Sequence, residues 1–132
     1  MGTVKIIIEK TDDLFSAYAD NVEGIYAGGE TVEEVKQSVL DAIELLKEHN
    51  TEENIPTILK GNYEITYHFD LESLLNYYKG IMSFSALERL TGVNQKQLQH
   101  YSTGHRKPRI DQRKKIETAL HKFGKELLAV EL

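Results

Sequence analysis

The sequence predicts an α+β fold in which a small sheet-and-helix domain is followed by an all-helical domain. One observation is the hydrophobic period, which changes from 2 in the stretch that ends at Phe69 to 3.6 from Asp70 onward. The other is charge. Residues 1–79 hold 6 Lys and 16 Asp or Glu and sum to −10, whereas residues 80–132 hold 10 Lys or Arg and 5 Asp or Glu and sum to +5. We therefore expect a β-β-β-α-β domain at 1–69 and a helical bundle at 70–132.

The overall composition excludes several classes of protein. The chain has 132 residues, of which 40% are apolar, and it has no Cys, so a disulfide framework or a thiolate metal site is excluded. No apolar run approaches the ~18 residues that a membrane span needs, and Met1 to Thr3 do not begin a signal-peptide pattern. We expect a soluble, cytoplasmic protein of one ordinary domain or two small ones.

The first domain contains four stretches with strand character. The first is rich in β-branched residues and nearly continuous, so we expect both of its faces to be covered. The last alternates strictly between apolar and polar residues. Turn residues at 11–13 and 21–24 separate the first three. The expected strands are Val4–Lys10, Leu14–Ala19, Ile25–Ala27 and Tyr63–Phe69.

A capped helix is expected between the third and fourth strands. Thr31 and Glu34 have capping-box spacing, in which Thr31 accepts from the Glu34 amide and Glu34 reaches back. An apolar stripe follows at spacings of three and four residues and indicates the buried side of the helix. Its members are Val32, Val35, Val39, Ile43 and Leu46. The helix should end near His49 and Asn50, and residues 51–62 should form a loop.

Four short helices are expected in the second domain. The predicted caps are Asp70 for the first helix, Ser83 or Ser85 for the second helix and Asn94 for the third helix. Gln97 then stands at the third position of the third helix, as in a capping box. Asp111 is predicted to cap the fourth, which should run to about Lys122 before Gly124 breaks it. Residues 126–132 form an apolar tail that could be a strand or a helix.

The second and third of these helices have the spacing of a helix-turn-helix. Gly92 permits the turn, while Leu87, Val93 and Leu98 hold the helices together. The remaining polar residues of the third helix have no evident core role and occupy the place where a recognition helix meets base edges. Phosphate contacts are expected from the helix start and the basic loop that follows. The predicted DNA-binding residues are Asn94, Gln95, Lys96, Gln97, Gln99, His100, Arg106, Lys107 and Arg109.

Residues 71–121 resemble the Cro/C1-type helix-turn-helix family. The resemblance is carried by Gly92-Val93, Asn94 in a cap position, Leu98, Gly104 and Pro108, followed by Ile110-Asp111, Lys115-Ile116 and Ala119-Leu120. Phe84 and Ser85 stand where that family usually has Gln, and Glu88 stands where it has a small residue. The resemblance implies binding to double-stranded DNA, and such modules read two half-sites as dimers. We expect a homodimer or a higher homo-oligomer.

Residues 3–48 resemble HicB-type antitoxins. The matching pieces are Ile8-Glu9-Lys10, Asp12-Asp13, Phe15-Ser16-Ala17, Val22-Glu23-Gly24, the run from Gly29 to Val35, and Asp41 to Glu44. The resemblance implies a partial RNase H-like fold and a HicA-like toxin as partner, which is a small basic protein that cuts mRNA with a His. It implies an antitoxin of a type II toxin–antitoxin system that represses its own operator. Asp20 and Glu23, in the turn after the second strand, are the candidate toxin-binding residues.

Other readings of the same residues remain open at this point. An RNase H-like nuclease needs carboxylates that converge on metal ions, but Glu9, Asp12, Asp13 and Asp20 show no such pattern, so we expect no enzyme activity. His100 and His105 lack further ligands, so we expect no metal and no cofactor. The helices could form a bundle without a DNA role, and the charge asymmetry could be chance clustering. The alternative function is a helix-turn-helix transcription factor whose N-terminal domain senses a small ligand. The acidic first domain favours an antitoxin because it complements a cationic toxin.

Overall fold

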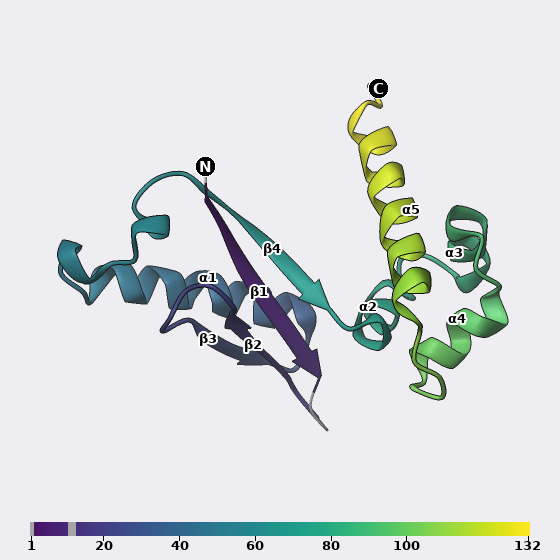
Figure 1. Cartoon of the computed structure of the whole chain (residues 1–132), viewed down its shortest axis with the longest axis horizontal. Coiled ribbons are helices and arrows are strands. Elements are labelled where there is room, and N and C mark those ends of the chain that lie inside the picture. The colour runs from purple at the N-terminus through teal and green to yellow at the C-terminus, as the bar shows by residue number, and fades with distance from the viewer. Residues whose placement is uncertain (1, 11–12) are drawn as a thin grey trace. The chain divides into compact units, whose positions relative to one another are not determined.

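A computed structural model describes residues 2–10 and 13–132. The chain forms two compact units, which we call unit 1 (Met1–Asp70) and unit 2 (Leu71–Leu132). Figure 1 shows a sheet with one long helix in unit 1 and a cluster of helices in unit 2. The α+β class predicted from the sequence is confirmed. The turn predicted at residues 11–13 lies largely outside the described residues.

Unit 1 is built on a four-stranded mixed sheet in the order β3-β2-β1-β4. β1 is antiparallel to β2, as expected for strands joined by a short turn, and parallel to β4, which the chain reaches only after the long helix and a loop. Both central strands are thus paired on two sides, and β3 and β4 form the edges. The strands are β1 (Gly2–Lys10), β2 (Phe15–Ala19), β3 (Tyr26–Gly29) and β4 (Tyr63–Phe69).

Helix α1 (Val32–Glu48) covers one face of this sheet. Its buried side chains, Val32, Val35, Val39 and Ile43, belong to the predicted stripe. The expectation that both faces of β1 are covered is wrong. Val4, Ile6 and Ile8 are buried, but Lys5 and Glu9 on the other face are exposed. Among the described residues of unit 1, α1 is the only α-helix that packs on the sheet, so the run of β-branched residues in β1 reflects strand propensity as well as burial.

The cap of α1 is confirmed, with a small change in its closing bond. The Glu34 amide donates to Thr31 Oγ1 at 3.1 Å, and Glu34 Oε2 accepts from the amide of Glu30, one residue before the cap, at 2.9 Å. After α1 the chain makes two single 3₁₀ turns, η1 (Glu52–Asn54) and η2 (Thr57–Leu59), and Leu59 is buried.

Unit 2 contains four helices around a single apolar cluster. They are α2 (Leu71–Tyr78), α3 (Phe84–Thr91), α4 (Gln95–Ser102) and α5 (Ile110–Leu128). The buried cluster consists of Leu71, Leu75, Leu87, Val93, Leu98, Tyr101 and Ile116. Of the two candidate caps for α3, the structure selects Ser83, whose Oγ accepts from the Ala86 amide at 3.0 Å.

Helix α5 departs from the prediction at both ends. Asp111 lies in the first turn, and Arg109 occupies the cap position without a side-chain hydrogen bond. Gly124 does not break the helix, which continues to Leu128 and includes the start of the predicted tail. A lone glycine costs a helix only ~1 kcal/mol. The good helix formers around it, among them Lys125, Glu126 and Leu127, outweigh that cost.

Candidate nucleic-acid interface

A short turn sets α4 against α3. Gly92 has φ of +75°, a left-handed conformation that other residues adopt only with strain. The buried Thr91 hydroxyl donates to the Leu87 carbonyl at 2.7 Å and accepts from the Val93 amide at 3.1 Å. Val93 is buried in the core cluster. The direction of α4 is therefore fixed by a backbone conformation, a pair of buried hydrogen bonds and an apolar plug.

The start of α4 is capped and presents polar side chains. Asn94 Oδ1 accepts from the Lys96 amide at 2.8 Å, so the predicted cap is confirmed, although its partner is Lys96. Leu98 is buried, whereas Gln95, Lys96 and Gln99 are exposed. The helical period of 3.6 residues places these three side chains on the side of α4 away from the core. They are free to meet a partner.

Gln97 differs from the other polar residues of α4. It is half-buried, and its Nε2 donates to the hydroxyl of Tyr101 at 2.9 Å. Tyr101 is itself buried, so this hydrogen bond satisfies the hydroxyl at the edge of the core. Gln97 thus has a structural partner that the sequence analysis did not identify. The signal was available, because the two residues stand at i and i+4 on one helix.

The loop after α4 returns to the end of that helix. The Arg106 amide donates to the His100 carbonyl at 3.2 Å, and the rings of His100 and His105 meet edge to face with centroids 4.8 Å apart. Gly104, with φ of +76°, makes this reversal possible. The structure therefore brings His105 and Arg106 to the end of the helix that carries the predicted base contacts. Lys107 and Arg109 follow in the same loop and are exposed.

All formally charged side chains in the segment 94–109 are positive. Residues 94–109 contain Lys96, Arg106, Lys107 and Arg109 and no Asp or Glu. Desolvation, followed by the positive charges of His105, Arg106 and Lys96, lowers the pKa of His100 below its usual 6.5. Its Nδ1 is buried and has no hydrogen-bond partner in the described part of the chain. Such a surface attracts anions, and phosphate groups are the anions that a row of cations on a helix and loop fits best.

Asp20 and Glu23 lie in the turn between β2 and β3, where the sequence predicted them. Both side chains are exposed. The turn is fastened to β1 through Asn21, whose Oδ1 accepts from the Lys5 amide at 2.9 Å and whose Nδ2 donates to the Thr3 carbonyl at 2.8 Å. Asn21 was not singled out from the sequence. Its bonds hold the backbone, so the two acids project from a fixed position.

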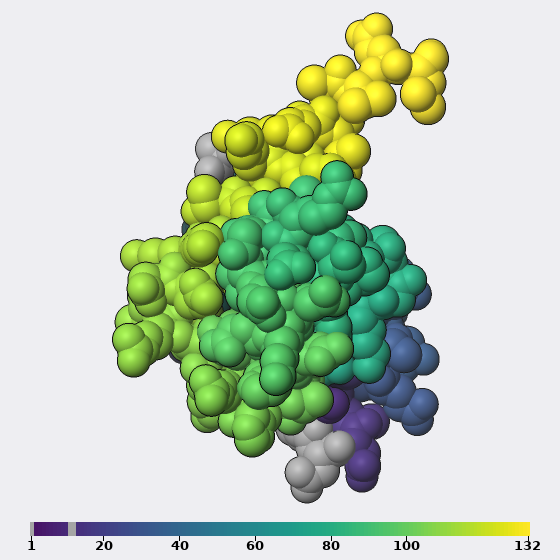
Figure 2. Space-filling view, turned by 90° about the vertical axis from the view of Figure 1, so that its right-hand side faces the viewer, coloured from purple at the N-terminus to yellow at the C-terminus, as the bar shows by residue number. Residues whose placement is uncertain are grey.

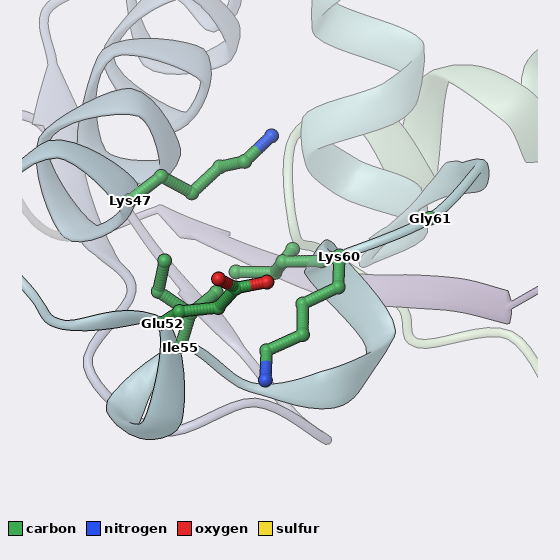
Figure 3. A pocket seen from close by; sticks show the side chains of 6 residues that line it. Lys47, Glu52, Ile55, Lys60 and Gly61 are labelled. Carbon is green, nitrogen blue, oxygen red and sulfur yellow. The ribbon is translucent and has the colours of Figure 1, made fainter.

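The carboxylates considered for a nuclease site do not form a metal-ligand cluster within residues 2–10 and 13–132. No group of three or more His, Cys, Asp or Glu side chains in these ranges could hold a metal ion. Asp12, one of the carboxylates considered for a nuclease, lies outside the described residues. Open depressions occur beside the 3₁₀ turns, and Figure 3 shows one of them, lined by Lys47, Glu52, Ile55, Leu59, Lys60 and Gly61. Its mixed charges and open form differ from the enclosed apolar pockets of small-ligand sites.

Comparisons with protein-family models, with curated proteins and with solved structures find no match for this chain. Within the described residues, no helix has both the length and the apolar character needed to cross a membrane.

Proposed function

We propose that the protein is the antitoxin of a type II toxin–antitoxin system. In this proposal unit 2 is a helix-turn-helix module that binds operator DNA and represses transcription. Unit 1 binds and neutralises a small basic HicA-like ribonuclease. The observation that carries the proposal is the outward side of α4, where exposed Gln95, Lys96 and Gln99 have no packing role.

Three features of unit 2 support binding to DNA in particular. The start of α4 is capped and exposed, so this end of the helix can approach a groove. Gln and Lys side chains can pair with adenine and guanine edges in the major groove. Arg106, Lys107 and Arg109 follow α4 in an acid-free loop and suit contacts to the phosphates on either side of that groove.

The composition of unit 1 supports the toxin as its partner. Met1–Asp70 holds 5 Lys against 15 Asp or Glu, a formal charge of −10. A protein that binds and cuts mRNA carries a cationic surface, and opposite charges accelerate the encounter of two proteins and favour the correct partner. The exposed acids Asp20 and Glu23 on the fastened turn are the proposed contacts. The resemblance of residues 3–48 to HicB antitoxins points to the same partner.

Separation of the two activities in the full-length chain tests the proposal. A triple variant, Gln95→Ala with Lys96→Ala and Gln99→Ala, is expected to lose the operator footprint while it still protects cells from the co-expressed toxin. A second variant, Asp20→Asn with Glu23→Gln, should show the reverse. Lys122→Ala, which removes one exposed cation from α5, is the matched control for Lys96→Ala.

Each outcome bears on a different part of the proposal. A normal footprint from the folded triple variant would refute the role of α4. Failure of the wild-type chain to silence a basic ribonuclease encoded beside it would refute the antitoxin role. Repression that is released by a small molecule and not by a protein would instead identify unit 1 as a ligand sensor.

A further inference from the structure

The face of the sheet opposite α1 carries a row of large side chains that crosses all four strands. The strand register aligns one residue from each strand in the order β3, β2, β1 and β4, namely Tyr26, Tyr18, Ile7 and His68. Ile7 lies between two buried isoleucines of β1, so the alternation of a strand places this row on the side away from α1 (Figure 1). In the described part of unit 1, no α-helix packs on the row.

Tyr26 distinguishes this row from the other exposed apolar surface of the chain. It is 75% exposed, and in residues 2–10 and 13–132 it is the only aromatic among the exposed large apolar side chains. The others are aliphatic, and several lie at the end of α5, where Figure 2 shows the chain projecting beyond the other helices of unit 2. The face of an aromatic ring attracts cations, which an aliphatic side chain does not do. The row can therefore select a partner by charge.

Small residues leave open space beside the two tyrosines. Gly28 stands two residues after Tyr26 on β3 and pairs with Ser16 on β2. A Cβ added at Gly28 would make only an ordinary contact with a backbone carbonyl oxygen, at 3.5 Å. Ser16 in turn pairs with Glu9 on β1, so Glu9 is the diagonal neighbour of Tyr18. Long side chains reach across such a diagonal, so one group of a partner can contact both the tyrosine ring and the carboxylate.

The charges around the row are mostly negative. Glu9 and Glu64 are exposed on this face. Asp20 extends it, because its amide donates to the Lys5 carbonyl at 2.7 Å and so continues the pairing of β2 with β1. Lys5 is the one Lys or Arg that alternation places on this face of the four strands, against three acids. Such a surface repels the phosphates of a nucleic acid and attracts cationic groups.

We propose that the open face of the sheet docks a small basic protein and that Tyr18, Tyr26 and Glu9 receive one of its arginine side chains. A guanidinium is planar, so it can stack on a tyrosine ring and pair with a carboxylate at the same time, whereas the compact ammonium of lysine suits this arrangement less well. The inference deepens the proposed function and rests on it for the partner, since it names the surface that a basic toxin covers. Asp20, already a proposed toxin contact, borders the same face.

Two peptides of equal charge test the arginine site on the full-length chain without any toxin. By fluorescence anisotropy, labelled hexa-arginine should bind about two- to fivefold more tightly than labelled hexa-lysine, which is the range of an exposed cation–π contact. Tyr26→Ser should remove this preference, and Glu9→Gln should weaken the binding of both peptides. The matched controls on α1 are Leu45→Ser, at a residue that is 53% exposed, and Glu44→Gln, at an exposed acid. Both controls should keep the preference, and Glu44→Gln should weaken binding less than Glu9→Gln.

Two results of the peptide titration would overturn the proposal. One is equal binding of the two peptides, or a preference for arginine that survives Tyr26→Ser. The other is tighter binding of oligouridine than of hexa-arginine, which would identify the face as a platform for single-stranded nucleic acid.

The basic ribonuclease encoded beside the chain separates this inference from the proposed function. Tyr26→Ser should raise the dissociation constant of its complex by about tenfold, as expected for an aromatic anchor, and Leu45→Ser should not. If Tyr26→Ser silences the ribonuclease as well as the wild-type chain does, the antitoxin role stands and this surface is refuted. If the wild-type chain prefers hexa-arginine through Tyr26 but does not silence the ribonuclease, the surface stands and the antitoxin role is refuted.

Discussion

The two units build their cores from different side chains, and the difference follows from how each unit joins its elements. In unit 1, Val and Ile dominate the core, and β1 meets β4 across some sixty residues of chain. In unit 2, Leu dominates, and α2 packs on α4 while α3 packs on both α4 and α5. β-branched residues suit a sheet, and unbranched Leu suits helices. Unit 1 is held by distant pairing, whereas unit 2 depends on a few residues in short helices.

This contrast also affects what each unit can present to a partner. α1 uses one side to cover the sheet and is longer than α4 by nine residues, at 17 against 8. α4 buries Leu98, Tyr101 and Ser102 and leaves most of its polar side exposed. A short helix with a single buried side has little packing to lose when its other side evolves for recognition. Unit 2 therefore combines a small core with a large exposed polar surface.

The largest expected effect is the loss of a core side chain, and it should differ in consequence between the units. Leu98→Ala is expected to destabilise unit 2 by about 2–5 kcal/mol, as is typical of a fully buried leucine. Ile6→Ala, equally buried in the sheet, should cost unit 1 a similar amount. Because unit 2 has only seven buried cluster residues, the first change should consume most of its stability. Amide exchange by NMR on the full chain measures both effects.

The same amide-exchange experiment tests whether the two units unfold independently. Loss of protection should stay within Leu71–Leu132 for Leu98→Ala and within Met1–Asp70 for Ile6→Ala. Exchange that rises equally throughout the chain in either variant would show that the units unfold as one.

The next effect concerns backbone conformation at the turn before α4. Gly92→Ala places a side chain at φ of +75° and should destabilise unit 2 by about 1–2 kcal/mol. Gly80→Ala is the control, since an added Cβ meets nothing within 4 Å and φ is not in the left-handed region. Chemical denaturation compares the two. If Gly92→Ala were as stable as the control, the turn would not be what sets α4 against α3.

Much of the fold was predictable because local signals and long-range packing agree in it. Thr31 begins α1, and the strict alternation of Tyr63–Phe69 makes β4. The expectations that were wrong concern segments whose structure depends on neighbouring or distant residues that a local pattern does not include. The sequence of β1 does not reveal that, in the described part of unit 1, α1 covers one face of the sheet and leaves Lys5 and Glu9 exposed on the other. Likewise, Gly124 alone predicts the end of a helix, but the residues around it favour a helix and α5 continues to Leu128.

The candidate site shows the same limit in a different way. Counting polar residues without a core role identified Gln95, Lys96 and Gln99, which are exposed. It also included Gln97, whose amide is bonded to Tyr101. The contact of His100 with His105 needs the reversal at Gly104, and a spacing of five residues does not predict it. Side chains on one helix can be placed from sequence, whereas contacts made through a loop require coordinates.

Substitutions at the cap positions of α1 and α5 should have smaller effects on stability. Comparing them distinguishes a cap that only stabilises a helix from a cap position that also contacts DNA. Thr31 caps α1, while Arg109 occupies the cap position of α5 and its side chain makes no capping hydrogen bond. Asp is among the best capping residues, so Arg109→Asp should stabilise unit 2 by about 0.5–1 kcal/mol. The same change removes a proposed phosphate contact and adds a negative charge, so it should weaken DNA binding. Thermal denaturation and a binding titration measure the two effects.

A single result would contradict this interpretation of Arg109. If Arg109→Asp stabilised unit 2 and left DNA affinity and its salt dependence unchanged, the poor cap would have no link to binding. Thr31→Ala in unit 1 should lower stability by ~1 kcal/mol and leave DNA binding intact, which makes it the reference for a cap without a second role.

The smallest effect is a pH dependence centred on His100. Desolvation and the nearby cations hold its pKa below 6.5, so the folded chain resists protonation and the free energy of unfolding should fall as pH drops below 6.5. Bound DNA should reverse the sign, because phosphates beside His105, Arg106 and Lys96 favour the charged imidazole. DNA affinity should therefore rise as pH falls from 8 toward 6. His100→Asn should flatten this profile, and His49→Asn in unit 1, an exposed histidine, should not. Equal profiles for the two variants would place the titrating group elsewhere on the protein and remove His100 from the interface.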